Sequence, residues 1–148
     1  MTVFAAVDST GYKIVLVLHL VTAVVAFAPA FMAFAVSRAA VTDKGAAEPL
    51  VAGVQRLAIP AMVLTGILGF GLAGMSDKLY KVSQTWLSVS AVCWVALVVV
   101  ALLMVRPAAK ALAAGVEGAR QKLMAGVGIT HLLFLVTIVM MVFKPGAP

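Results

Sequence analysis

Charged side chains are scarce in this sequence. Lys and Arg together number 11 and Asp and Glu number 5 among 148 residues, so that 11% of the chain is charged. Soluble domains carry about a quarter charged residues, because charge is needed to cover a surface that faces water. With 64% hydrophobic residues, this chain is suited to lipid instead. Composition therefore predicts an integral membrane protein in contact with a lipid bilayer.

Cysteine pairs, buried carboxylates and catalytic motifs are missing as well. The one cysteine, Cys93, lies in an apolar run, which excludes an internal disulfide framework and a Cys-rich metal site. The apolar runs contain no Asp or Glu, and the chain has no His-x-x-x-His pair, Gly-rich phosphate loop or nucleophile–base pair. A channel or transporter would need more polar residues along a path. The balance favours a protein that is not an enzyme.

Four apolar runs are present, at about 14–37, 57–75, 85–105 and 123–143. A helix needs roughly 20 apolar residues to cross the hydrocarbon core. Backbone groups in lipid must be hydrogen-bonded internally, so these runs are predicted to be helices. The fold expected for residues 1–148 is therefore all-α, a single domain formed by an antiparallel bundle of four transmembrane helices. Residues 46–56 and 108–119 have a composition that can extend the second and third helices.

The net charge is +6, and the basic residues lie in short loops and not on one face. This distribution indicates the orientation of the chain in the membrane, and we expect no binding of nucleic acid. Seven basic residues lie in the loops after the first and third runs, and four lie on the other side. The positive-inside rule then places both long loops in the cytoplasm and both termini outside. The seven are Arg38, Lys44, Arg56, Arg106, Lys110, Arg120 and Lys122, and the four are Lys13, Lys78, Lys81 and Lys144.

Small residues recur every three or four positions on the first two runs. In lipid, helices associate where small residues let their backbones approach, so such stripes predict contact faces. We therefore expect the first two helices to pack on each other, with His19 on the packed face. Pro29 and Pro60 are expected to bend these helices. The stripes are His19, Ala23, Ala26, Ala30, Ala33 and Ser37 on the first run, and Ala61, Thr65, Gly69 and Ala73 on the second.

Two histidines, His19 and His131, are the ionisable residues near the centres of the runs. Ionisable groups at this depth are rare and usually face the bundle interior or a cavity. An imidazole on a helix is a common axial ligand of haem iron. The predicted depths of the two rings differ by roughly 9 Å, so ligation by both competes with ligation by His19 alone. Either histidine can equally serve only as a hydrogen-bonding group between helices.

Several short fragments stand in a shared order over most of the chain and resemble the CopD-like superfamily of small four-helix membrane proteins of the bacterial inner membrane. The fragments are Tyr12-Lys13, Leu18-His19, Arg56-Leu57, Pro60 to Thr65, Gly69, Trp86-Leu87 and Lys144-Pro145. For the HemJ-type protoporphyrinogen oxidases of that superfamily, the resemblance implies haem b held by His19 and by a lysine of the third helix. Here Ser88 and Ser90 stand where that pattern has histidine and lysine. The chain is more similar to the uncharacterised integral-membrane branch.

Three functions remain open from the sequence. The first is a haem b or porphyrin-associated membrane protein that uses His19, with or without His131, and in which Arg56 at the cytoplasmic headgroup level binds a propionate. The second is a non-catalytic accessory subunit of a larger respiratory or photosynthetic-type membrane complex, or a homo-oligomer. The third is copper handling through methionine and histidine, with Met140 and Met141 as candidates.

Overall fold

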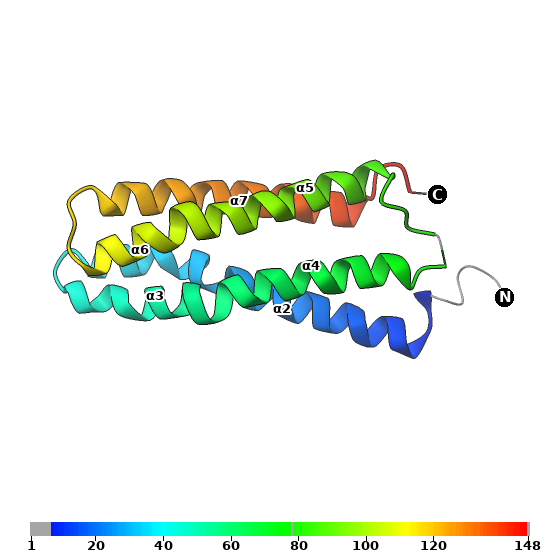
Figure 1. The fold of residues 1–148 in the computed structure, drawn as a ribbon, viewed down its shortest axis with the longest axis horizontal. Helices are drawn as coiled ribbons and strands as arrows, with labels where there is room; N and C mark the ends of the chain where they lie inside the picture. Colours follow the sequence, from blue (N-terminus) through cyan, green and yellow to red (C-terminus); the bar gives the residue numbers. More distant parts are fainter. Residues whose placement is uncertain (1–6, 78, 148) are drawn as a thin grey trace.

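The computed structural model describes residues 7–77 and 79–147, and these form helices joined by short turns (Figure 1). Lys78, one of the residues used to predict orientation, lies outside them. Four stretches are long and apolar enough to cross a membrane, which agrees with the four predicted runs. They are Thr10–Ala39, Gly45–Gly74, Thr85–Ala113 and Ala119–Phe143.

The first and last helices are uninterrupted. Helix α2 spans Thr10–Ala39 and begins where the Ser9 hydroxyl accepts a hydrogen bond from the backbone N–H of Tyr12, which satisfies a donor that the first turn leaves free. Helix α7 spans Ala119–Phe143 and follows Gly118, whose φ of 73° is a conformation that glycine adopts without strain. Pro29 is accommodated inside α2 as a buried residue.

The two middle helices extend further than the apolar runs predict. The second consists of η1 (Lys44–Ala47), α3 (Glu48–Gly53), η2 (Val54–Ala58) and α4 (Ile59–Gly74). The third consists of α5 (Thr85–Val100), η3 (Ala101–Val105) and α6 (Arg106–Ala113). The added segments are rich in alanine and carry charges, which lowers hydropathy but not helix propensity. Hydropathy alone therefore starts the second helix too late and ends the third too early, whereas the composition of residues 46–56 and 108–119 correctly predicts that the two helices extend into these segments.

Each middle helix contains one widened, π-helical turn directly before a proline. The backbone N–H of Ile59 donates to the carbonyl of Val54, and that of Arg106 donates to the carbonyl of Ala101, five residues back in both cases. Pro60 and Pro107 follow and have no N–H to continue the α-helical ladder. The widened turn allows the helix to continue past the proline.

The helices pack as two pairs, α2 with α4 and α5 with α7, and Figure 1 shows these pairs as two layers. We call the end with turns 40–43 and 114–118 the basic end, and the opposite end, with residues 75–77 and 79–84, the terminal end. One buried cluster at the basic end includes Val54 and Val105 and joins both pairs. A second, around Phe27 and Phe134, lies in the middle; the two rings are 3.8 Å apart between centroids.

A tryptophan of α5 makes a close contact with α4. The indole N–H of Trp94 donates to the backbone carbonyl of Met62 at 2.8 Å. Its ring covers Gly66 so closely that a Cβ at this glycine would lie 2.2 Å from the ring. Phe70 packs edge-on against the same ring, with centroids 6.1 Å apart. The contact between Trp94 and α4 therefore requires a glycine at position 66.

We predict that Gly66→Ala destabilises the protein and that Gly71→Ala does not. The added methyl group at Gly66 has to displace the Trp94 ring and its hydrogen bond, whereas nothing lies within 4 Å of a Cβ at Gly71. Overpacking of this kind costs about 1–3 kcal/mol, while alanine in a helix gains up to about 1 kcal/mol over glycine. Thermal unfolding in mild detergent measures the difference. Equal stabilities of the two variants would contradict this packing.

Candidate functional site

His19 lies on the face of α2 that packs against α4, as the small-residue stripes predict. Its Nδ1 is 2.9 Å from the backbone carbonyl oxygen of Thr65. A carbonyl oxygen can only accept a hydrogen bond, so Nδ1 carries the proton and Nε2 of a neutral ring carries a lone pair. The neighbouring helix therefore fixes both the orientation and the tautomer of this imidazole.

Two threonines continue the contact between α2 and α4. The Thr22 hydroxyl donates to the carbonyl oxygen of His19 at 3.0 Å. The Thr65 hydroxyl lies 3.0 Å from the Thr22 hydroxyl and 2.8 Å from the carbonyl oxygen of Ala61, and donates its single proton to one of them. All these groups are partly buried, so each bond forms away from bulk water. His19, Thr22 and Thr65 thus form one polar network between two apolar helices.

Gly69 provides the space that the His19 ring occupies. A Cβ at Gly69 would lie 3.1 Å from Cε1 of His19, closer than ordinary contact. The carbonyl of residue i in an α-helix points toward residue i+4, so a ring that reaches the Thr65 carbonyl must pass over position 69. The same relation joins the Met62 carbonyl, Gly66 and Trp94. Two glycines of α4 therefore expose two carbonyls to donors from two other helices.

The second nitrogen of His19 is not completely buried. Within the described part of the chain, Nε2 of His19 has no hydrogen-bond partner. Every fully buried side-chain nitrogen and oxygen of these residues does have a partner, so Nε2 is not one of the fully buried atoms. Histidines that bind metals typically donate their other ring N–H to a carbonyl or carboxylate, which orients the ligand. His19 has this arrangement. It can offer Nε2 to a Lewis acid without losing its contact with α4.

His131 is not brought together with His19. Its Nδ1 lies 2.8 Å from the carbonyl oxygen of Val127, one turn back on its own helix. Its ring meets Phe31 edge-on, with centroids 5.0 Å apart. Phe31 is 12 residues from His19 on α2, or about 18 Å along the axis. This separation exceeds the predicted mismatch in depth and is too large for both rings to bind one iron.

Arg56 lies on the widened turn η2 and is exposed. It is nine residues from Thr65 along the second helix, or about 13 Å from the level of His19. The two residues are therefore on neighbouring elements without direct contact.

The two serines that depart from the HemJ-type pattern hydrogen-bond to the backbone. Ser90 donates to the carbonyl oxygen of Trp86 at 2.7 Å and Ser88 lies 3.2 Å from that of Gln84. Ser90 is buried on α5, so its hydroxyl is already used within the helix. Among the described residues, no group of three His, Cys, Asp or Glu side chains is placed to hold a metal ion.

Sequence reasoning missed Trp94 and the threonine bridge. Trp94 reads as an apolar residue in an apolar run, and its partner is a backbone carbonyl that no side chain marks. A signal for the Trp94 contact was present in α4, where Gly66 lies four residues after the accepting carbonyl of Met62, as Gly69 does after that of Thr65. A glycine in a membrane helix can therefore indicate a donor from a neighbour as well as close approach of two backbones.

We predict that Thr65→Val weakens the bundle more than Thr137→Val does. Both hydroxyls lie within hydrogen-bond distance of the carbonyl four residues back, but only that of Thr65 also lies within hydrogen-bond distance of a hydroxyl on another helix. Hydrogen bonds between membrane helices contribute about 0.6 kcal/mol on average and up to about 1.7 kcal/mol. Unfolding of the two variants in the same detergent gives the difference, and a Thr137→Val variant that is equally destabilised would argue against the bridge.

Comparisons with protein-family models, with curated proteins and with solved structures find no match for this chain. The resemblance to the CopD-like superfamily therefore stays a prediction, and a function has to be argued from the residues themselves. The strongest argument available is the oriented imidazole of His19.

Proposed function

We propose that this protein is an antiparallel four-helix membrane protein of the bacterial inner membrane that binds haem b or a related metalloporphyrin through Nε2 of His19. The observation that carries the proposal is the hydrogen bond from Nδ1 to the Thr65 carbonyl, which leaves Nε2 unprotonated and accessible. Membrane insertion is supported by the four long apolar helices. The exposed apolar side chains along them, such as Val24 at 71% and Leu103 at 72%, suit lipid contact.

The residues fit an axial histidine ligand. The ring is held by a hydrogen bond to a second helix, and the absence of a side chain at Gly69 leaves room for it in this position. A bound haem would supply one-electron redox chemistry. His19 would orient the group, and Arg56, on the widened turn η2 that precedes α4, would be the cation for a propionate.

His131 is the weaker ligand candidate of the two. Its Nδ1 is bonded to its own helix, so its orientation depends on one rotamer rather than on contact with a second helix. Phe31 covers one edge of its ring. This difference makes His131 a matched control, because both residues are half-buried histidines with Nδ1 bonded to a carbonyl.

We predict that purified protein titrated with haemin develops a Soret band typical of ligated haem, and that His19→Ala removes it while His131→Ala keeps it. Gly69→Ala is expected to weaken haemin binding by roughly tenfold, since it shifts the His19 ring, whereas Gly71→Ala leaves it unchanged. Absorbance spectroscopy measures these effects. A wild-type protein without the band, or a His19→Ala variant that retains it, would refute the proposal.

A second candidate is an accessory subunit of a membrane complex. Gly71 and Gly74 on α4 and Gly128 on α7 are exposed, and nothing lies within 4 Å of a Cβ built on any of them. Small residues on membrane helices commonly mark faces where another helix packs, and these three are not used for packing within the described residues.

We predict for this candidate that the protein purifies from its native membrane together with another membrane protein, and that Gly128→Leu releases that partner. Leucine at position 128 adds bulk to a site that an incoming helix backbone would contact. Mass measurement of complexes in mild detergent tests this, with Leu132→Val as a control on the exposed face of the same helix. Recovery of only a monomer or a homodimer would count against the accessory role.

A further inference from the structure

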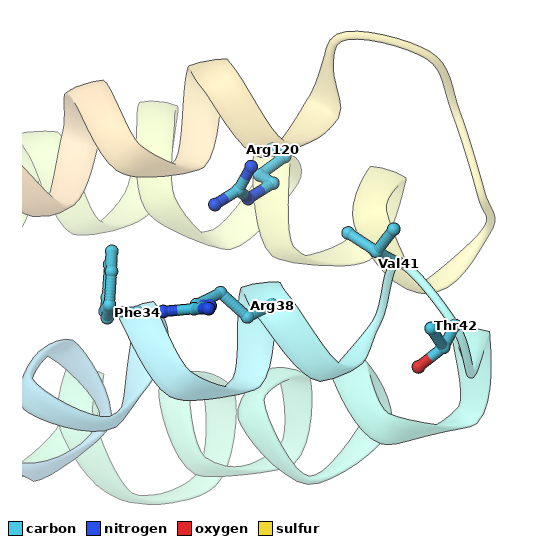
Figure 2. Close-up of a pocket in the computed structure, with 5 residues that line it drawn as sticks. All are labelled: Phe34, Arg38, Val41, Thr42 and Arg120. Atoms are coloured by element: carbon cyan, nitrogen blue, oxygen red, sulfur yellow. The ribbon is translucent and has the colours of Figure 1, made fainter.

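The basic end of the bundle has a pocket with a volume of about 430 Å³, lined by Phe34, Arg38, Val41, Thr42 and Arg120 (Figure 2). Arg38 lies in the last turn of α2 and Arg120 is the second residue of α7. Figure 2 shows that the two arginines come from opposite sides of the pocket. Two segments far apart in the sequence thus place two permanent positive charges around one hollow.

Neither arginine is neutralised by the protein. Among the described residues, neither forms a salt bridge within 4.0 Å; the pair that does form joins Lys13 and Asp8. The first turn of α7 contains no acidic residue, and neither does the last turn of α2. Two like charges around a pocket repel each other unless an anion lies between them. The charge of the pocket therefore favours an anionic ligand.

Two of the three other lining residues, Phe34 and Val41, are apolar, and their presence favours one source of the anion. The Arg38 guanidinium carbon lies 5.8 Å from the centre of the Phe34 ring, one turn further into the apolar part of α2. Phe34 is 57% exposed and Val41 is 71% exposed. A soluble phosphate would gain nothing from these surfaces, whereas a lipid places a phosphate beside its own hydrocarbon chains.

We infer that this pocket binds the phosphate of an anionic phospholipid, with Arg38 and Arg120 donating to its oxygens and Phe34 contacting the glycerol and upper acyl region. Arginine suits this role because its planar group of N–H donors matches phosphate oxygens. The inference rests on the membrane insertion proposed above but not on haem binding, since Arg38 is 19 residues, or about 28 Å, from His19 along α2.

The test is a lipid titration of the full chain in mild detergent, followed by native mass spectrometry. Phosphatidylglycerol and phosphatidylcholine of equal chain length are the probes. The variant is Arg38→Gln with Arg120→Gln, and the control is Arg106→Gln with Lys110→Gln, which removes the same charge from α6 at the same end. We expect the variant to bind phosphatidylglycerol about tenfold more weakly and the control to bind it like the wild type.

Four results would overturn the inference. They are a variant that binds like the wild type, a control that loses as much affinity, phosphatidylcholine that binds as tightly as phosphatidylglycerol, and displacement of the lipid by excess inorganic phosphate. Arg120→Gln alone breaks no hydrogen bond or ion pair of the described residues, so it tests the site if the double variant does not fold. Extraction of the chain from membranes at alkaline pH would refute insertion itself, a separate outcome from loss of lipid selectivity.

Discussion

Two backbone carbonyls of α4 accept hydrogen bonds from other helices, and the arrangement of the bundle depends on them. The Thr65 carbonyl accepts from His19 on α2, and the Met62 carbonyl accepts from Trp94 on α5. Helix α4 thereby links the α2–α4 pair to the α5–α7 pair. Burying a ring N–H group in an apolar environment without a hydrogen-bond partner costs free energy. The rings of His19 and Trp94 are therefore stable where each meets an exposed carbonyl of α4.

The same constraint explains why a histidine can lie in this position and remain available. Burial of an imidazole between apolar helices requires one partner, and the Thr65 carbonyl is that partner. Because the partner is a backbone atom, it does not compete for protons or change its charge. The ring is thus held firmly at one nitrogen while the other stays accessible, and this division separates the structural role of His19 from any ligand-binding role.

The sequence is sufficient to predict some of these features and not others. The stripe that contains Ala61, Thr65 and Gly69 correctly predicts the α2–α4 contact and the packed face of His19, since close packing needs small residues at helical spacing. The contact between Trp94 and Gly66 escapes prediction because a glycine can mark an exposed carbonyl but does not identify the residue that donates to it. The early start of the second helix at Glu48 escapes hydropathy, because that segment is helical but not strongly apolar. The pocket between Arg38 and Arg120 depends on tertiary structure, as 82 positions separate its two charges.

The widened turns before Pro60 and Pro107 have a consequence for how the two middle helices present their faces. A π-helical turn contains about one residue more than an α-helical turn, so all later residues lag in phase by about 100°. Each middle helix therefore consists of two helical segments in different rotational phase. Both phase changes lie close to the buried cluster that contains Val54 and Val105. The two middle helices therefore change phase at the same level of the bundle. A single helical wheel drawn for a whole middle helix therefore assigns the residues of one half to the wrong face. The two middle helices resemble each other in this shared change of phase and not in matching residues.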